Sequence, residues 1–151
     1  MIFLLDTNIL SAVMASRPAA EVATWMAQYP LDVLFTAAVC QAEILSGIAI
    51  LPKGPHGSSP WAEGPRREAL EIAALATFRE DFAGRILPFD TDAAVVYAEI
   101  FADRRSAGRP AATADLMIAS IARVRGAIVV TRDTAGFCGC GLTLINPWAH
   151  S

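Results

Sequence analysis

The first ten residues, MIFLLDTNIL (residues 1–10), place a carboxylate directly after an apolar run. Residues 1–5 have the length and composition of a short buried strand, and Asp6, Thr7 and Asn8 follow at once. No basic residue lies near Asp6 in the sequence. The N-terminal stretch therefore predicts a core strand that ends in a polar site.

Length and composition favour one compact domain. The chain has 151 residues, of which 54% are hydrophobic and 18% charged, so we expect a single domain over residues 1–151. No window stays apolar for the ~18 residues that a membrane span needs. The start lacks the basic region and uninterrupted apolar stretch of a signal peptide, so a cytoplasmic protein without a membrane anchor is expected.

The residue types available for chemistry are few. Cys40, Cys138 and Cys140 lack zinc-site spacing and are expected to be reduced thiols. The two histidines, His56 and His150, lie in a loop and at the C-terminus, which disfavours a histidine-based triad or metal site. Any catalysis is therefore expected to depend on carboxylates. The net charge is −3, and every basic residue except Lys53 is Arg, a side chain suited to bidentate phosphate contacts.

Apolar periodicity and turn residues divide the chain into alternating strands and helices. The expected strands are 1–5, 33–35, 85–89, 127–131 and 142–146, and the expected helices are 8–14, 19–28, 37–51, 66–82, 92–108 and 114–126. Asn8, Thr36, Thr91 and Thr113 are the candidate N-caps, and Gly126 is the candidate stop of the last helix. Residues 52–65, rich in Pro, Gly and Ser, are expected to form a loop. This alternation predicts an α/β/α sandwich with a mostly parallel central sheet.

Four acids fall where such a sheet binds ligands. Asp6 and Asp133 each follow a predicted strand, and ligands of open α/β sheets bind outside the carboxyl ends of the strands. Glu43 lies on the helix after the second strand, and Asp115 lies in the first turn of a later helix, with small residues around both. Taken singly, Asp115, Glu43 and Asp133 fit ordinary helix-surface or turn positions, whereas Asp6 interrupts the boundary of a core strand with no basic partner nearby. Together they would repel one another unless a cation neutralised them.

A hard divalent cation fits this set. Oxygen ligands without His or Cys favour Mg²⁺, or Mn²⁺, with several waters retained. Thr7, Asn8 and Thr131 are available to orient the ligands. Such an ion can polarise a phosphodiester and activate a water for in-line attack.

These residues, read in order, resemble the PIN-domain ribonucleases, in particular the VapC-type toxins of bacterial toxin–antitoxin pairs. The resemblance rests on LLDTNILS, AEIL, DFAGRILPFD, TADLMIASIA, VVTRD and INPW, and it covers nearly the whole chain. It implies a PIN-like fold and a Mg²⁺-dependent endoribonuclease that hydrolyses RNA without a covalent enzyme intermediate. Asp6, Glu43, Asp115 and Asp133 match the family's acids.

The chain departs from the resemblance in two places. Similar proteins often carry an Asp where this chain has Gly136, which leaves Asp133 as the only acid of that loop. Residues 55–65 look like an insertion of unassigned role, in which Trp61 could mark a contact.

The resemblance also implies a cognate antitoxin whose tail enters the acidic groove, and a homodimer. Candidate RNA contacts are Arg104, Arg105, Arg109 and Arg132. The RNA cleaved, the antitoxin and the number of metal ions do not follow from the sequence.

Two alternatives stay open. One is another Mg²⁺-dependent phosphohydrolase or a receiver domain, although a haloacid-dehalogenase-like phosphatase needs an Asp where Asn8 stands, and a receiver needs a late Lys. The other is a catalytically weakened PIN-like module that only binds RNA or a protein, which Gly136 would allow.

Overall fold

The computed structural model describes residues 1–51 and 63–149. Its elements are β1 (Phe3–Leu5), α1 (Thr7–Met14), α2 (Ala20–Met26), the 3₁₀ turn η1 (Leu31–Val33), β2 (Leu34–Ala37), α3 (Ala38–Ala49), α4 (Glu63–Ala76), the π-helical turn η2 (Thr77–Asp81), β3 (Ile86–Leu87), α5 (Thr91–Ser106), α6 (Thr113–Arg125), β4 (Ile128–Val130), α7 (Thr134–Phe137) and β5 (Leu144–Ile145). Each of the five expected strands is present; β1, β3, β4 and β5 are shorter than expected, whereas β2 begins one residue later and ends two residues later than expected. The short helix α7 was not predicted.

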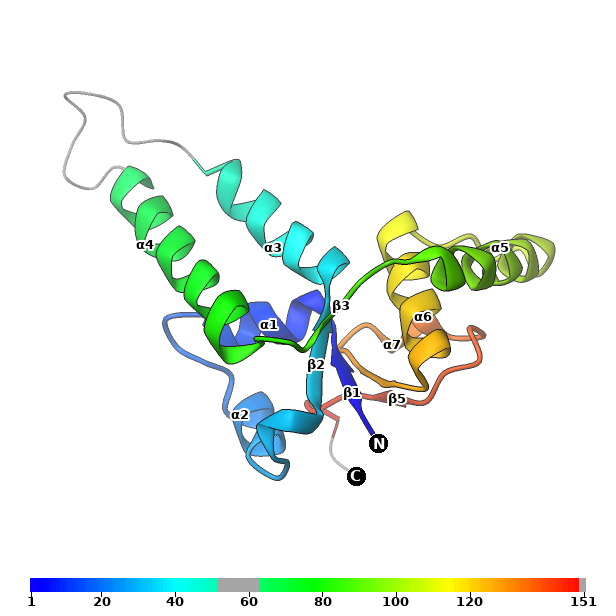
Figure 1. The fold of residues 1–151 in the computed structure, drawn as a ribbon, viewed down its shortest axis with the longest axis horizontal. Helices are drawn as coiled ribbons and strands as arrows, with labels where there is room; N and C mark the ends of the chain where they lie inside the picture. The colour runs from blue at the N-terminus through cyan, green and yellow to red at the C-terminus, as the bar shows by residue number, and fades with distance from the viewer. Residues whose placement is uncertain (52–62, 150–151) are drawn as a thin grey trace.

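The strands form one sheet in the order β3-β2-β1-β4-β5, and every pairing is parallel. This confirms the predicted α/β/α architecture. Figure 1 shows α1 to α4 on one side of the strands and α5 to α7 on the other. Right-handed crossovers explain this division, because the chain moves outward in one direction from β1 to β3 and then returns to continue from β4 in the opposite direction. The reversal lies between β1 and β4, which makes their carboxyl ends the topological switch point of the sheet.

The core forms around β1, whose three residues are all buried. The Phe3 ring packs against Trp25 and Tyr29 of the α2 region, with ring centroids 5.1 and 4.5 Å apart. On the other face of the sheet, α6 buries Leu116, Ile118 and most residues of its middle turns. A fully buried β1 explains why its sequence is a continuous apolar run and not an alternating one.

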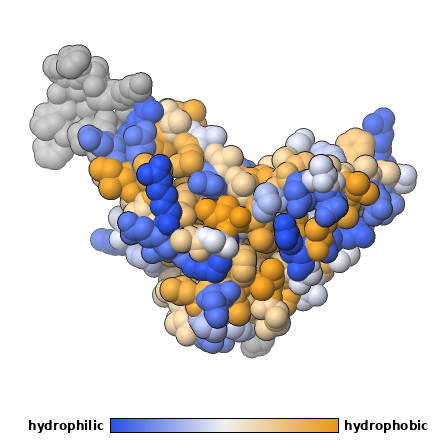
Figure 2. Space-filling model, in the orientation of Figure 1, coloured by the Kyte–Doolittle hydropathy of each residue, from blue (hydrophilic) through white to orange (hydrophobic). Residues whose placement is uncertain are grey.

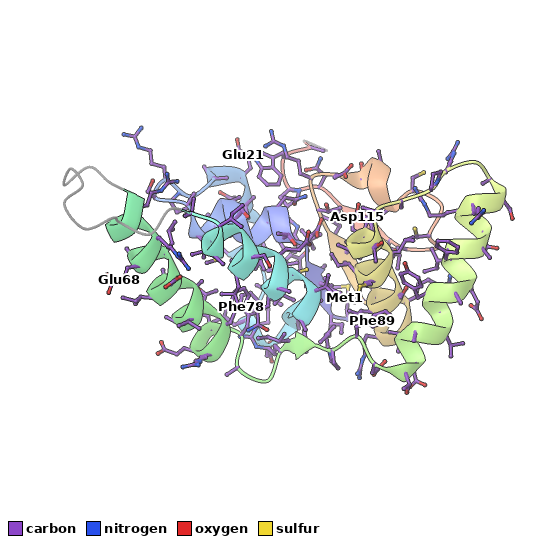
Figure 3. The ribbon with its side chains drawn as sticks, turned by 90° about the horizontal axis from the view of Figure 1, so that it is seen from above. Met1, Glu21, Glu68, Phe78, Phe89 and Asp115 are labelled. Carbon is purple, nitrogen blue, oxygen red and sulfur yellow. The ribbon has the colours of Figure 1, made fainter. Side chains whose placement is uncertain are left out.

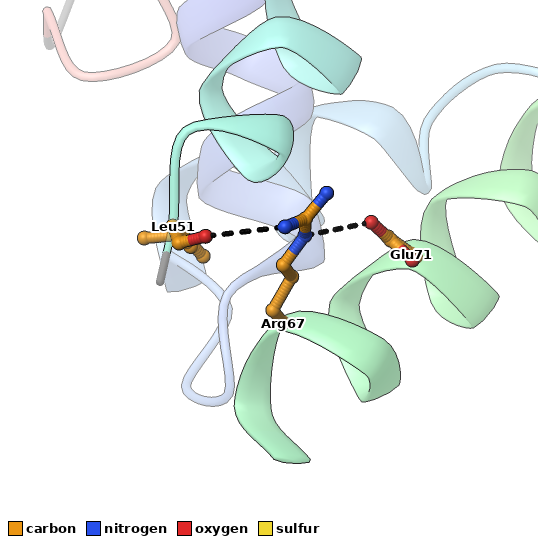
Figure 4. Close-up of polar contacts among 3 residues, drawn as sticks. All are labelled: Leu51, Arg67 and Glu71. Carbon is orange, nitrogen blue, oxygen red and sulfur yellow. Dashed lines mark hydrogen bonds and ion pairs between the residues drawn. The ribbon is translucent and has the colours of Figure 1, made fainter. Parts of the chain in front are cut away.

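Helices α3 and α4 pack side by side as an arm of the molecule (Figure 1). Arg67 of α4 connects the two helices, because its guanidinium donates to the carbonyl of Leu51, just after the end of α3, at 3.4 Å (Figure 4). The same guanidinium pairs with Glu71 of its own helix at 2.9 Å. The expected loop over residues 52–65 is wrong at its end, since α4 already begins at Glu63. The rest of that loop, with Lys53, His56 and Trp61, lies outside the described residues, as does His150.

The expected N-caps are wrong in each case. Asp6 caps α1 in place of Asn8, and Asp90 caps α5 in place of Thr91, since each carboxylate accepts a hydrogen bond from a backbone N–H of the first turn. Thr36 belongs to β2, and its hydroxyl donates to the Leu5 carbonyl at 2.9 Å instead of capping α3. Neither α3 nor α6 has a side-chain cap, so Thr113 does not cap α6.

The stop of α6 was predicted correctly, since Gly126 takes the left-handed conformation with φ 64°. Within residues 1–51 and 63–149, no helix is both long and apolar enough to cross a membrane.

Candidate active site

Asp6 lies at the switch point of the sheet and is only 5% exposed. Its backbone N–H donates to the Val130 carbonyl at 2.9 Å, so the residue continues the pairing of β1 with β4. Its Oδ1 accepts from the Thr7 backbone N–H at 2.7 Å, and its Oδ2 accepts from Thr131 Oγ1 at 2.7 Å and Asn8 Nδ2 at 3.3 Å. These three hydrogen bonds hold the Asp6 carboxylate in place. Because each carboxylate oxygen can accept about two hydrogen bonds, Oδ1 can still accept one more.

Thr131 connects Asp6 to the loop that carries Asp133. Its buried hydroxyl donates to Asp6 and accepts from Asn8 Nδ2 at 3.2 Å and from the Asp133 backbone N–H at 3.1 Å. Asn8 Oδ1 in turn accepts from the Arg132 backbone N–H at 3.1 Å. The start of α1 and the segment after β4 are therefore fixed relative to each other by side chains that also orient Asp6.

Glu43 reaches the site from α3. Thr7 Oγ1 donates to Glu43 Oε1 at 2.6 Å, which joins an exposed carboxylate of α3 to the first residue of α1. The structure thus brings Glu43 beside Asp6 through a residue that is 36 positions away in the sequence. The predicted involvement of Thr7 with the acids is seen as a direct contact.

Asp115 and Asp133 approach each other at Gly136. A β-carbon at position 136 would lie 2.8 Å from Asp133 Oδ2 and 3.3 Å from Asp115 Oδ2. The Gly136 backbone N–H donates to Asp133 Oδ1 at 3.2 Å, so Asp133 caps α7. The first turn of α6 and the start of α7 therefore present two carboxylates to the same small space.

The four acids share one electrostatic field. The pKa of Asp115 is raised to about 6, mainly by burial and then by the negative charges of Asp6, Asp133 and Glu43, while the charge of Arg104 opposes the shift. Burial is also the main cause that raises the pKa of Asp6, against the hydrogen bonds from Thr131 and Thr7 and with the charges of Glu43 and Asp133. Asp6 and Asp115 therefore resist ionisation beside the other acids, which is the condition that a bound cation relieves.

The donors suit a hard divalent cation. All four side chains offer carboxylate oxygens, and the described residues place no His or sulfur ligand among them. In that same part of the chain, no three His, Cys, Asp or Glu side chains form a ready-made cage for a metal. An open set of acids fits an ion such as Mg²⁺, which binds one or two carboxylates directly and keeps several waters.

The cysteines add no reactive group at the acids. Cys40, Cys138 and Cys140 are all free thiols, and Cys40 and Cys140 are buried. Burial, together with the charge of Asp6, raises the pKa of Cys40 to about 12. Cys40 is therefore a neutral thiol in the floor of the site.

A hollow of about 760 Å³ opens between α3 and α6, with Glu43 in its wall. It is lined by Ala38, Val39, Ala42, Glu43, Ser46, Pro88, Phe89 and Met117. Figure 2 shows the surface notched between the α3–α4 arm and the α5–α6 pair, with hydrophobic residues at the floor. Figure 3 shows Asp115 at the start of α6 and Phe89 before α5, on the side of the notch opposite α3. Glu43 therefore lies in the wall of an open hollow, and the other three acids are close enough to share its electrostatic field.

The four arginines predicted to contact RNA divide into two groups. Arg105, Arg109 and Arg132 are exposed. Arg104 is only 8% exposed, and its guanidinium donates to the carbonyls of Arg109, at 2.9 Å, and Cys138. The prediction is wrong for Arg104, because packing of α5 against the loop after α7 turns its side chain inward.

A comparison of the chain with protein-family models agrees with this geometry. The model of the PIN domain matches residues 3–138. The chain belongs to the PIN-domain family. Membership excludes the phosphatase and receiver-domain alternatives, whose folds place their acids on other scaffolds.

Three relatives align over nearly their whole length. The plasmid stability protein StbB of Pseudomonas syringae pv. tomato is 40% identical, with 96% of this chain and 97% of that protein covered. The VapC ribonuclease Y4jK of Sinorhizobium fredii is 34% identical, with coverage of 95% and 96%. The toxin FitB of Neisseria gonorrhoeae is also 34% identical, with coverage of 96% and 97%.

Solved structures agree with this assignment. The structure of FitAB bound to an IR36 DNA fragment has a TM-score of 0.85 and 31% identity, with 99% of this chain and 98% of that chain covered. VapBC-5 of Mycobacterium tuberculosis, described as a member of the VapBC family of toxin–antitoxin systems, has a TM-score of 0.64 and 26% identity, with coverage of 96% and 98%. The PIN-like fold is therefore present along nearly the whole chain.

Sequence reasoning missed one feature beside the acids. The guanidinium of Arg132 lies over the Trp148 ring, 4.7 Å from its centroid. The available signal was the INPW stretch after the last strand, which ends at the same edge of the sheet as Asp6 and Asp133.

Proposed function

We propose that this chain is a metal-dependent endoribonuclease and the toxin of a toxin–antitoxin pair, formed by one PIN-like domain over residues 1–151. The observation that carries the proposal is the convergence of four carboxylates, from β1, α3, α6 and the loop after β4, at the switch point of a PIN fold. Relatives of matching length are named VapC ribonuclease and toxin FitB.

Divalent-metal dependence is a property of PIN nucleases, and we infer Mg²⁺ as the resident ion, with Mn²⁺ as a substitute. Asp6, Glu43, Asp115 and Asp133 would hold it. When bound, such an ion activates a water and stabilises charge on the phosphoryl oxygens. The preference for Mg²⁺ rests on a donor set of oxygens only.

The protein's own residues prepare the site for hydrolysis. Thr131, Asn8 and the Thr7 backbone N–H fix the Asp6 carboxylate, and Thr7 Oγ1 fixes Glu43. Their hydrogen bonds remove the need to reorganise these acids when substrate arrives. Among the described residues, the thiol near the acids belongs to buried Cys40, whose pKa is raised to about 12, so we propose that water attacks the scissile bond and that no covalent intermediate with the enzyme forms.

An antitoxin partner and a homodimer complete the proposal. An acidic cleft is complementary to an Arg of an inhibitory protein segment, which would occupy the place of the cation. Large apolar side chains are exposed on α4 and α5, among them Ile72 and Val95, each 63% exposed. Surfaces of this kind are typical of protein contacts. A toxin that cuts cellular RNA acts in the cytoplasm, which we take as its location.

The alternative of a catalytically weakened binding module loses its support from Gly136. Asp133 folds against Gly136 and fills the space beside Asp115 that a side chain at 136 would need. The loop thus still presents one carboxylate at this place, as a nuclease requires.

The test is calorimetric titration of the antitoxin-free protein with Mg²⁺ and Mn²⁺, beside cleavage of a labelled RNA pool in the same buffers. Asp6→Asn is expected to abolish both while the protein stays folded. Asp32→Asn, at an exposed acid of η1, is the matched control and is expected to behave as wild type. Cleavage by folded Asp6→Asn would overturn the metal role, and a folded wild type that neither binds metal nor cleaves would favour the binding module.

A further inference from the structure

Arg132 and Trp148 form a stacked pair beside the acids. The Thr131 backbone N–H donates to the Ile145 carbonyl at 2.9 Å, which is the last hydrogen bond between the β4 and β5 segments before they separate. Arg132 is the next residue after Thr131, and Trp148 lies three residues after Ile145. Its guanidinium lies 4.7 Å from the centroid of the Trp148 ring, so both side chains stand at the carboxyl edge of the sheet.

The backbones of both residues are fixed. The Arg132 N–H donates to Asn8 Oδ1 at 3.1 Å, and Asn8 also donates to Asp6. The Trp148 N–H donates to Asn146 Oδ1 at 3.0 Å. Two hydrogen bonds therefore connect the backbone of Arg132 to the most buried acid of the site.

Within residues 1–51 and 63–149, no ion pair neutralises the charge of Arg132. In the described ranges, the two ion pairs are Arg67–Glu71 and Arg125–Asp90, and neither includes Arg132. Arg132 is exposed, and the ring of Trp148 covers one face of its guanidinium. The N–H groups at the edge of a stacked guanidinium stay free to donate, in a plane that the ring holds fixed.

RNA binding requires such a cation here. A strand that enters the acidic cleft brings one negative charge per nucleotide, and a metal at the acids compensates only the scissile phosphate and its neighbouring carboxylates. The remaining phosphates need fixed positive charge close by. Arg132 directly precedes Asp133, and a guanidinium can make bidentate contact with a phosphate.

We propose that the Arg132–Trp148 pair is a subsite that binds a phosphodiester of the RNA strand flanking the one that is cut. Arg132 donates to the phosphate oxygens, and Trp148 holds the guanidinium in the orientation that this contact needs. The inference rests on the proposed ribonuclease function and adds the position of the substrate strand to it: the strand leaves the acids over β4 and β5.

The experiment compares wild type with Arg132→Gln, Arg132→Lys and Trp148→Phe. Arg79→Gln, at an exposed arginine of η2, removes the same charge away from the acids and is the matched control. A fluorescent single-stranded RNA is titrated in EDTA at several salt concentrations, cleavage is measured with Mn²⁺, and thermal unfolding is followed for each variant.

Arg132→Gln is expected to weaken RNA binding about tenfold, as for loss of a charge-assisted contact. The slope of log affinity against log salt should fall by about 0.7, the value for one phosphate contact to a single strand. KM should rise with little change in kcat. Arg132→Lys should lose part of the affinity because it keeps the charge without the planar fork. Trp148→Phe should lose a smaller part than Arg132→Gln, because Phe keeps an aromatic face but attracts the guanidinium less strongly than Trp.

Four outcomes overturn the inference. Equal losses in Arg132→Gln and Arg79→Gln would show an effect of net charge alone. Wild-type RNA affinity in Arg132→Gln, with weaker binding of an antitoxin peptide, would assign the pair to the protein partner. A wild type that neither binds nor cleaves RNA would remove the ribonuclease proposal together with this subsite, whereas RNA cleavage by wild type with unchanged binding by Arg132→Gln would remove the subsite alone.

Discussion

Gly136 stands so close to Asp133 that a β-carbon at position 136 would lie 2.8 Å from Asp133 Oδ2. Real β-carbons essentially never come within 3.0 Å of another heavy atom, so the carboxylate keeps this place only because residue 136 is Gly. The same residue holds the acid through its backbone N–H, which donates to Asp133 Oδ1. The missing side chain at 136 is therefore part of the arrangement of Asp133.

Gly136→Ala is expected to push the Asp133 carboxylate away from Asp115. Divalent-metal affinity should fall by about tenfold, the lower end of the range for disturbed ligand support, while the melting temperature stays close to wild type. Calorimetric titration with Mn²⁺ measures the affinity. Gly47→Ala is the control, because a β-carbon at this helical glycine meets nothing within 4 Å. Unchanged affinity in Gly136→Ala would mean that Asp133 does not hold the metal.

Thr131→Val tests the network around Asp6. The substitution keeps the shape but removes a fully buried hydroxyl that donates to Asp6 and accepts from Asn8 and Asp133. Leaving these groups without their partner should lower the free energy of unfolding by about 1–3 kcal/mol, measured by urea denaturation. Thr131→Ser keeps the hydroxyl and should retain most of the stability and metal affinity. A Thr131→Val protein as stable as wild type, beside a destabilised Thr131→Ser, would show that methyl packing, and not the hydroxyl, matters.

The acids of the site could be predicted from the sequence because their positions depend on local signals. Asp6 and Asp133 follow apolar strand sequences, and parallel strands carry their carboxyl ends to one edge of a sheet. The inward turn of Arg104 could not be predicted, since it depends on contact with Cys138, 34 residues away. The stacking of Arg132 on Trp148 depends likewise on the register of β4 with β5.

The predicted N-cap residues were wrong for a related reason. A Thr before a helix is a common cap, but Thr36 lies in β2, where its hydroxyl has a better partner in the Leu5 carbonyl of the neighbouring strand. Asp6 was assigned only to the site, whereas it caps α1 as well. A side chain with two acceptor oxygens can serve both purposes, which a residue-by-residue reading of caps does not consider.

Arg104→Met should destabilise the fold and should not act on RNA directly. The buried guanidinium donates to the carbonyls of Arg109 and Cys138. Losing these two hydrogen bonds should lower the free energy of unfolding by about 1–3 kcal/mol. Arg105→Met, at the adjacent exposed arginine, should stay within about 0.5 kcal/mol of wild type. Urea denaturation distinguishes them. A stable Arg104→Met protein with weakened RNA binding would return Arg104 to the RNA contacts.

The raised pKa of Asp115 predicts an unusual pH dependence of the metal-free protein. In the folded state this pKa is about 6 instead of 3.8, so between these values the folded protein binds more protons at Asp115 than the unfolded chain. Stability therefore falls as pH rises through this window and levels off above the folded pKa. The elevated pKa of Asp6 acts in the same direction.

The effect of Asp115 appears as the difference between wild type and Asp115→Asn, which cancels the titration of distant groups. In EDTA, the melting temperature of wild type relative to Asp115→Asn should decrease as pH rises from about 4 to about 7. With Mg²⁺ the sign reverses for wild type, because the ion binds the deprotonated acids and its affinity rises through the same window. A metal-free difference that stays constant or increases with pH would show that Asp115 is not held in the shared field of the other acids.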